Sequence, residues 1–308
     1  MSIRTNRREF CRRLAIGGAA LFTAPRPLWS ASIANDRSHT AAGPYKIAVC
    51  DWMILKRQKL GAFSLASEIG ADGVQLDMGG LGQRETFDNK LADPAVARQF
   101  MEEAGKNQME ISSIAMSGFY AQSLAERPTV GRMIDDCMET MRQMKVKVAY
   151  LPLGVHADLV KRPAIRPAVV ERLKEAGKKA EKGGCCIAVE TSLSASEELA
   201  FLEEIGSPHI KISFNFANAV KNDRDIATEL STLGREHLAQ IHASDTDGVW
   251  LENNPKIDMP RIKETLDAMD WSGWLIVERS RDVEDVHNVR KNYGANVAYL
   301  KSVFQSER

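Results

Sequence analysis

Four polar side chains stand at or near the ends of short apolar runs in the second half of the chain, and together they form a possible set of metal ligands. They are Glu190, Asn215, His242 and Glu278. Two carboxylates, an amide oxygen and an imidazole suit Mn²⁺, Co²⁺, Zn²⁺ or Mg²⁺ better than a soft metal. An ionised glutamate inside an apolar strand is unfavourable unless it is paired or metal-bound. We therefore expect one divalent ion at these residues.

Each of the four residues also has an explanation that involves no metal. Glu190 and Glu278 would be compatible with salt bridges to Arg279 or Lys211. A lone His242 would be an ordinary hydrogen-bonded core histidine, although its position between two acidic strand ends favours a ligand. Buried asparagines commonly serve as structural hydrogen-bonding groups, which is the alternative explanation for Asn215.

The elements that would position these residues alternate along the chain from residue 45 to the end. Apolar runs typical of strands cover residues 46–52, 73–78, 109–117, 146–152, 185–191, 210–216, 238–244 and 274–280. Nearly continuous apolar runs are expected for parallel strands that are buried on both faces.

Helix start and stop signals separate these runs. Asp93-Pro94 predicts the start of a helix that would end at Gly105. Ser194 and Glu197 form a capping box, which predicts the start of another helix that would end at Gly206. Asp258-Met259-Pro260 opens another helix, with Ile262, Leu266 and Met269 on one face. A stripe of Met133, Cys137, Met141 and Met144 is typical of core packing.

This alternation predicts a single (β/α)₈ barrel, with a doubly wound open sheet as the alternative fold. The open sheet lacks support because no G-x-G-x-x-G follows the first strand and no P-loop occurs. In a barrel, the active site forms where the strands end. We therefore expect Trp52, His156, Asn218 and Arg279, which lie at or just beyond the ends of the first, fourth, sixth and eighth strands, to bind the substrate.

The composition excludes several classes of protein. The chain has 308 residues, 44% of them hydrophobic and 27% charged, with a formal net charge of zero. This is ordinary for a globular protein and argues against a basic nucleic-acid binder. No apolar run is long enough to predict a membrane span. The sequence leaves the oligomeric state open.

The first 34 residues have the pattern of an export signal. Arg7-Arg8 precedes an apolar stretch over residues 14–24, and the segment has a small-residue end at Ser32-Ile33-Ala34. This pattern resembles a twin-arginine signal, which exports folded proteins. We therefore predict a signal peptide at 1–34, a linker at 35–44, a barrel domain at 45–308 and a periplasmic or secreted location. The alternative is a basic helix that stays on the protein.

Cleavage at Ala34 would change both the charge and the cysteine count. It removes six arginines and one glutamate, which leaves a net charge of −5. Such a surface repels phosphate backbones, so we expect no nucleic-acid partner. Four cysteines remain, and no C-x-x-C pair occurs among them. A zinc ribbon or a disulfide framework is therefore not expected.

The stretch Ile241-His242-Ala243-Ser244-Asp245 resembles the His-x-x-Asp strand end of the xylose isomerase-like TIM barrels. This sugar phosphate isomerase/epimerase group shares its domain with endonuclease IV. Val189-Glu190-Thr191 and Val277-Glu278-Arg279-Ser280 fit the same pattern, and residues 241–282 resemble an exported bacterial branch. The resemblance covers residues 46–300.

The resemblance implies where a metal would bind. Epimerase members of the family hold it with Glu, Asp, His and Glu on strands five to eight, which match Glu190, Asn215, His242 and Glu278. The two glutamates also act as the acid/base pair. Asn215 departs from the family aspartate, and Ala217-Asn218 departs from the usual Gly-His. The endonuclease members need three zinc ions and more histidines, so that activity is not expected.

The activity that the resemblance implies is a metal-dependent sugar isomerase or epimerase acting on a keto-sugar through an enediolate. One glutamate removes the proton next to the ketone, and its return on the other face or at the other carbon gives epimerisation or isomerisation. A β leaving group would make the enzyme a lyase or dehydratase, for instance on a 3-keto-glycoside. A third possibility is a non-catalytic barrel that binds a saccharide.

Overall fold

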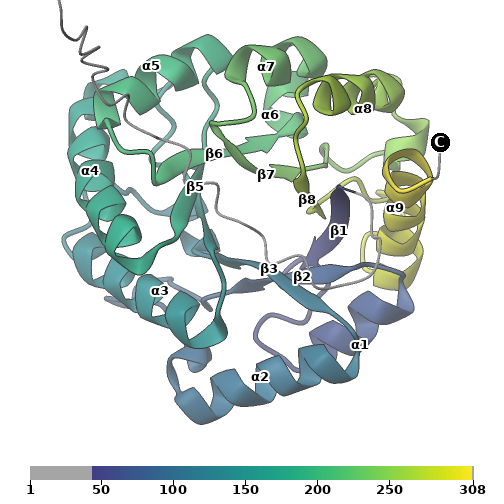
Figure 1. Cartoon of the computed structure of the whole chain (residues 1–308), viewed down its shortest axis with the longest axis horizontal. Coiled ribbons are helices and arrows are strands. Elements are labelled where there is room, and N and C mark those ends of the chain that lie inside the picture. Colours follow the sequence, from purple (N-terminus) through teal and green to yellow (C-terminus); the bar gives the residue numbers. More distant parts are fainter. Residues whose placement is uncertain (1–43, 307–308) are drawn as a thin grey trace, which may run out of the picture. The chain divides into compact units, whose positions relative to one another are not determined.

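The computed structural model describes residues 44–306, in which eight parallel strands form a closed barrel (Figure 1). The strands are β1 (Tyr45–Cys50), β2 (Gly73–Asp77), β3 (Glu110–Ala115), β4 (Val148–Pro152), β5 (Cys186–Glu190), β6 (Ile210–Asn215), β7 (Leu238–His242) and β8 (Gly273–Val277). Each strand pairs with the next, and β8 pairs with β1. The predicted (β/α)₈ barrel is confirmed, and the open-sheet alternative is wrong. The predicted signal peptide, and the linker up to residue 43, lie outside the described residues.

Helices connect the strands and surround the barrel (Figure 1). The α-helices are α1 (Gly61–Glu68), α2 (Pro94–Lys106), α3 (Val130–Met144), α4 (Arg166–Gly183), α5 (Ala195–Ile205), α6 (Phe216–Lys221), α7 (Ile226–Leu233), α8 (Met259–Ala268) and α9 (Val289–Phe304). Short 3₁₀ helices are η1 (Lys90–Ala92), η2 (Ser117–Ala121), η3 (Pro163–Ile165) and η4 (Leu251–Asn253). Within residues 44–306, no helix combines the length and hydrophobicity needed to cross a membrane.

Most of the predicted helix boundaries are found in the structure. Asp93 caps α2, and Asp258 caps α8. Ser194 and Glu197 form the predicted capping box of α5, which ends at Gly206 in the left-handed conformation. Gly105 does not end its helix, because α2 continues through this residue to Lys106. The left-handed turn that follows is made by Gln108, with φ 55°.

The strands separate two environments. Side chains on their outer face join the apolar core under the helices, where the predicted stripe of α3 is buried. Alternate side chains, such as Ala48, Cys50 and Ile276, form a second cluster inside the barrel. The interior is thus narrow, and several of its remaining positions are polar.

Two glutamine–serine pairs lie at these inner polar positions. Gln75 of β2 pairs in register with Ser113 of β3, and Gln240 of β7 pairs with Ser213 of β6. In each case, the strand register shifts directly before the pair. The amide nitrogens donate to the serine hydroxyls at 2.8 Å for Gln75 and 3.1 Å for Gln240. The two pairs are closely matched in local structure, but their other contacts differ.

Candidate active site

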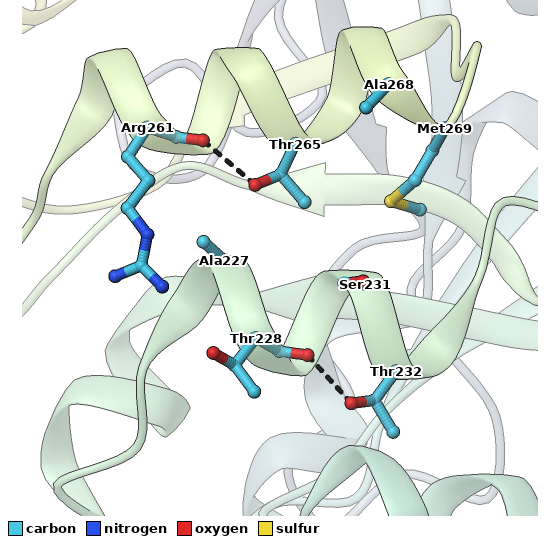
Figure 2. A pocket seen from close by; sticks show the side chains of 8 residues that line it. All are labelled: Ala227, Thr228, Ser231, Thr232, Arg261, Thr265, Ala268 and Met269. Atoms are coloured by element: carbon cyan, nitrogen blue, oxygen red, sulfur yellow. Dashed lines mark hydrogen bonds between the residues drawn. The ribbon is translucent and has the colours of Figure 1, made fainter.

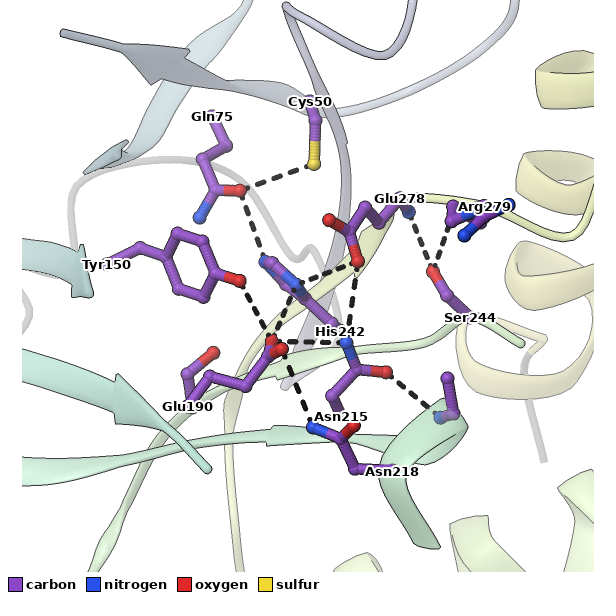
Figure 3. A network of polar contacts seen from close by, with 12 residues as sticks. Cys50, Gln75, Tyr150, Glu190, Asn215, Asn218, His242, Ser244, Glu278 and Arg279 are labelled. Carbon is purple, nitrogen blue, oxygen red and sulfur yellow. Dashed lines mark hydrogen bonds and ion pairs between the residues drawn. The ribbon is translucent and has the colours of Figure 1, made fainter. Parts of the chain in front are cut away.

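The structure brings the four predicted site residues together at the carboxyl ends of β5 to β8 (Figure 3). Glu190, Asn215 and His242 are the last residues of β5, β6 and β7, and Glu278 directly follows β8. Parallel strands all end at the same edge of the sheet, so these positions meet in space. Glu190 Oε2 lies 3.3 Å from His242 Nδ1, and Glu278 Oε2 lies 3.6 Å from the same nitrogen.

His242 is the centre of this cluster. Its side chain is fully buried, and Nδ1 has no partner in hydrogen-bond geometry although both carboxylates lie close to it. Burial alone would lower the pKa of His242, but Glu190 and Glu278 outweigh burial and raise this pKa to about 9. Without another cation, an imidazolium therefore balances one of the two carboxylate charges.

Neutral donors hold the carboxylate of Glu190. The Tyr150 hydroxyl donates to Oε2 at 3.0 Å, Asn215 Nδ2 donates to the same oxygen at 3.1 Å, and Asn218 Nδ2 reaches Oε1 at 3.5 Å. Burial raises the pKa of Tyr150 well above its ordinary value, so the phenol stays a donor. These contacts fix the carboxylate without adding a positive charge.

Glu278 is held by its charged neighbours as well as by an amide. Burial would raise the pKa of Glu278, but His242 and Arg279 outweigh burial and hold this pKa below its ordinary value. Asn215 Nδ2 lies 3.4 Å from Glu278 Oε2. The backbone N–H of Glu278 donates to Ser244 Oγ at 2.7 Å. This carboxylate is therefore ionised at neutral pH.

Asn215 presents its amide nitrogen, rather than its oxygen, to the two carboxylates. Its Oδ1 accepts the backbone N–H of Ala217 at 2.9 Å and so caps the first turn of α6. Coordination of a metal through Oδ1 would require the amide to turn over and give up this cap. The assignment of Asn215 as a ligand therefore stays a prediction.

The donor set fits a divalent ion. Within residues 44–306, no three His, Cys, Asp or Glu side chains are arranged to hold a metal ion, and the carboxylates of Glu190 and Glu278 lie next to the imidazole of His242 instead. The buried Nδ1 of His242 nevertheless lacks a hydrogen-bond partner. Ligands about 2.1 Å from an ion stand about 3.0–3.4 Å apart. The separations of 3.3 and 3.6 Å are close to that spacing.

Two of the predicted substrate-binding residues lie beside the cluster. Trp52 is half-buried and stacks on Tyr150, with ring centroids 6.4 Å apart and planes 12° apart. The Tyr150 ring lies 4.5 Å from the His242 ring, centroid to centroid. Asn218 joins the cluster through Glu190, and its Nδ2 also donates to the carbonyl of Thr191 at 2.9 Å. The buried Tyr150 ring thus lies between the His242 ring and the partly exposed Trp52 ring.

The structure does not place the other two predicted substrate-binding residues in the cluster. The Arg279 guanidinium donates to Asp247 Oδ2 at 2.7 Å, and the Arg279 side chain is 44% exposed. Asp247 also binds Arg281 through both carboxylate oxygens. His156 lies exposed in the loop after β4. A substrate role for Arg279 or His156 stays a prediction.

The sequence analysis did not single out two buried residues that contact the cluster. Tyr150 donates to Glu190, and Gln75 Oε1 lies 3.1 Å from His242 Nε2. Both lie inside apolar strands, at positions that alternate with outward-facing core residues. A search for polar residues at inward positions, rather than only at strand ends, would have found them.

A cavity of about 470 Å³ lies elsewhere, between α7 and α8 on the outside of the barrel (Figure 2). It is lined by Ala227, Thr228, Ser231, Thr232, Arg261, Thr265, Ala268 and Met269. Thr232 and Thr265 donate to carbonyls of their own helices, and Arg261 pairs with Asp225. No carboxylate or imidazole lines this cavity, so we place the chemistry at the barrel mouth.

Comparison with known proteins identifies relatives of this architecture. A 2-epi-5-epi-valiolone 7-phosphate 2-epimerase of Actinoplanes sp. is 27% identical over 210 residues, which cover 65% of this chain and 72% of that protein. The crystal structure of D-psicose 3-epimerase from Clostridium cellulolyticum H10 with D-tagatose has a TM-score of 0.66 and 12% identity, covering 85% of this chain and 100% of that chain. A 3-keto-D-glucoside 4-epimerase from E. coli has a TM-score of 0.64 and 15% identity, covering 84% and 99%.

The family profile described as xylose isomerase-like TIM barrel matches residues 63–303. This range contains Glu190, Asn215, His242 and Glu278, and it covers seven of the eight strands. The match spans most of the chain and agrees with the closed parallel barrel. The chain therefore belongs to the xylose isomerase-like TIM barrel family.

Proposed function

We propose that the protein is a sugar epimerase or isomerase that moves a proton on a carbon next to the ketone of a keto-sugar. The observation that carries this proposal is the convergence of two carboxylates, the buried one of Glu190 and the partly buried one of Glu278, on one imidazole nitrogen. The relatives named as epimerases support an enzyme of this type. The substrate would be a small keto-sugar or a related cyclic ketone.

The proposed reaction uses the two glutamates as an acid/base pair. One ionised carboxylate accepts the proton from the carbon beside the ketone, and the electron pair left on carbon forms an enediolate. The other glutamate, in its protonated form, returns a proton to the opposite face, which inverts the carbon. Return at the neighbouring carbon gives an isomer instead.

Neighbouring residues would support this proton transfer. Tyr150 and Asn215 hold the Glu190 carboxylate in place through hydrogen bonds of 3.0 and 3.1 Å. The Trp52 ring, which is partly exposed and is supported from behind by the stacked Tyr150 ring, would offer an apolar surface for the carbon face of a sugar. Held by Glu190, His242 and Glu278, a divalent cation would supply Lewis-acid polarisation of the ketone oxygen.

The experiment that tests this proposal is solvent deuterium uptake. The protein is loaded in turn with Mn²⁺, Co²⁺, Zn²⁺ and Mg²⁺ and incubated in D₂O with D-fructose, D-psicose, D-tagatose and a 3-keto-glucoside. We expect deuterium beside the ketone together with an epimer or isomer, and loss of exchange after chelation. Elimination products would instead support a lyase. Saccharide binding without any exchange would overturn the enzymatic proposal.

We also propose that the chain is exported and that its mature form begins near residue 35. This rests on Arg7-Arg8 and the apolar stretch at residues 14–24. Intact-mass analysis of the protein from its native source tests the proposal directly. A periplasmic or membrane-associated chain that still begins at Met1 would contradict it.

A further inference from the structure

We infer that Gln75 is a positioning residue that fixes the tautomer of His242, so that the Nδ1 lone pair faces Glu190 and Glu278. Figure 3 shows Gln75 reaching His242 from β2, on the side of the ring away from the carboxylates. The inference rests on the proposed metal site, and it extends that site to a strand that provides none of the predicted ligands.

The contact between Gln75 and His242 crosses the interior of the barrel. Gln75 Oε1 lies 3.1 Å from His242 Nε2, and both side chains are fully buried. An amide oxygen only accepts hydrogen bonds, so Nε2 must carry the hydrogen. A neutral imidazole with hydrogen on Nε2 has its lone pair on Nδ1.

Two further contacts orient the Gln75 amide. Its Nε2 donates to Ser113 Oγ at 2.8 Å, and its Oε1 lies 3.3 Å from Cys50 Sγ. Burial raises the pKa of the Cys50 thiol well above its ordinary value, so the thiol stays protonated and needs an acceptor. The amide oxygen, rather than the nitrogen, therefore lies between Cys50 and His242.

Loss of the Gln75 acceptor would change which ring nitrogen keeps the hydrogen. His242 Nδ1 lies 3.3 Å from Glu190 Oε2, so a neutral ring without Gln75 would place its hydrogen on Nδ1 and donate it to this carboxylate. In that tautomer, neither the Nδ1 lone pair of His242 nor Oε2 of Glu190 would be available to bind a metal. Loss of a residue that hydrogen-bonds a metal-ligating histidine typically lowers metal affinity by about 10- to 100-fold.

Gln240 provides a matched control inside the same barrel. It is buried, follows the same kind of register shift and donates to Ser213 Oγ at 3.1 Å. Its Oε1 has no hydrogen-bond partner among the described residues. Substitution of Gln240 thus removes the same side chain and the same serine contact without removing the acceptor of His242.

The first experiment compares Zn²⁺ binding by Gln75→Met, Gln75→Glu and Gln240→Met through competition with a chromophoric chelator. We expect Gln75→Met to bind Zn²⁺ about 10- to 100-fold more weakly than the wild type. Gln240→Met should stay within about threefold, and Gln75→Glu, which keeps an acceptor, should recover much of the affinity. Equal losses in both methionine variants would overturn the inference.

The second experiment reads the tautomer directly and does not depend on metal binding. Long-range ¹H–¹⁵N spectra are recorded on metal-free protein above about pH 10, where the imidazole is neutral. We expect hydrogen on Nε2 in the wild type and in Gln240→Met, and on Nδ1 in Gln75→Met. The same tautomer in all three would overturn the inference. If the wild type did not bind Zn²⁺, the proposed metal site would be overturned. The tautomer measurement would still decide whether Gln75 positions His242.

Discussion

Two pairs of carboxylates lie at the mouth of the barrel, all buried except the partly buried Glu278, and they differ in what faces them. Glu190 and Glu278 face the His242 imidazole at 3.3 and 3.6 Å. Asp51 and Asp77, at the ends of β1 and β2, are held mainly by backbone N–H groups. The side chain of Asp77 is completely buried, and its Oδ2 has no hydrogen-bond partner.

The different surroundings shift the pKa values of Asp77 and Glu278 in opposite directions. Burial raises the pKa of Asp77 to about 6 against the opposing charge of Arg57, whose Nε lies 3.7 Å away. Burial and the charge of Asp77 raise the pKa of Asp51 well above its ordinary value. The pKa of Glu278, in contrast, lies below its ordinary value because a cation faces it. We infer that the glutamate pair takes part in the proposed proton transfer, whereas the aspartate pair has a structural role.

The largest expected effect is on catalysis. Glu190→Gln and Glu278→Gln keep side-chain size and an oxygen but remove the base, so each should lower deuterium exchange by about 10²- to 10⁴-fold. Asp77→Asn should change exchange by less than about threefold. The measurement is exchange rate at saturating metal. An equal loss in Asp77→Asn would remove the distinction between the two pairs.

Removal of the imidazole should expose the mutual repulsion of the glutamates. His242→Ala leaves the carboxylates of Glu190 and Glu278 without their cation, which should destabilise the metal-free protein by about 3–5 kcal/mol and abolish metal binding at ordinary concentrations. Thermal unfolding with a chelator and metal analysis measure the two effects. A His242→Ala protein with a full metal complement would show that His242 is not a ligand.

The same imidazole predicts a pH dependence of stability in the metal-free protein. The pKa of His242 is raised to about 9 in the folded state, above an ordinary value of about 6.5. Its stabilising contribution is therefore complete below pH 6.5 and disappears as the pH rises through 9, by about 3 kcal/mol in total. Denaturant unfolding between pH 6 and 10 should show this loss in the wild type and not in His242→Ala.

Removal of a charge from the aspartate pair should stabilise the protein, whereas removal of the His242 charge should destabilise it. The pKa of Asp77 is raised to about 6, so the ionised form destabilises the fold increasingly as the pH rises from about 4 to 6, and fully above 6. Asp77→Asn should therefore stabilise the protein by up to about 3 kcal/mol at pH 8 and by much less at pH 4. Melting curves of both proteins at the two pH values provide the test. A pH-independent difference would contradict it.

The smallest expected effect concerns Asn215, whose amide nitrogen contacts both members of the glutamate pair. Asn215→Asp adds a third carboxylate beside Glu190 and Glu278, so metal affinity should rise by about tenfold and turnover should fall. Titration of both proteins with the same metal at fixed pH measures the change. Identical dissociation constants would leave Asn215 as a donor and helix cap only.

The sequence predicted the barrel and the meeting of Glu190, His242 and Glu278 for one physical reason. Parallel strands end at a common edge, so a polar residue at the end of an apolar run is expected at the mouth of a closed barrel. The position of each strand end was therefore enough to bring these three residues together. No knowledge of side-chain rotamers was needed.

The features that the sequence did not predict depend on side-chain direction and long-range pairing. The orientation of the Asn215 amide depends on the helix start at Ala217, which competes for its oxygen. The contact between Gln75 and His242 joins residues 167 positions apart. The pairing of Arg279 with Asp247 depends on how two loops meet. Periodicity along one element carries no information about such contacts.

The closure of the barrel has a consequence for how the chain folds. Five residue pairs, from Tyr45 with Gly273 to Val49 with Val277, join the first and last strands. In α9, Lys301 bonds Asp72 at 2.6 Å, and the following Gln305 bonds the carbonyl of Tyr45 at 3.1 Å. Until these late segments have been synthesised, β1 is an open edge strand that can pair with another chain. We therefore expect closure to be a late kinetic step, and shortening α9 to favour aggregation during folding.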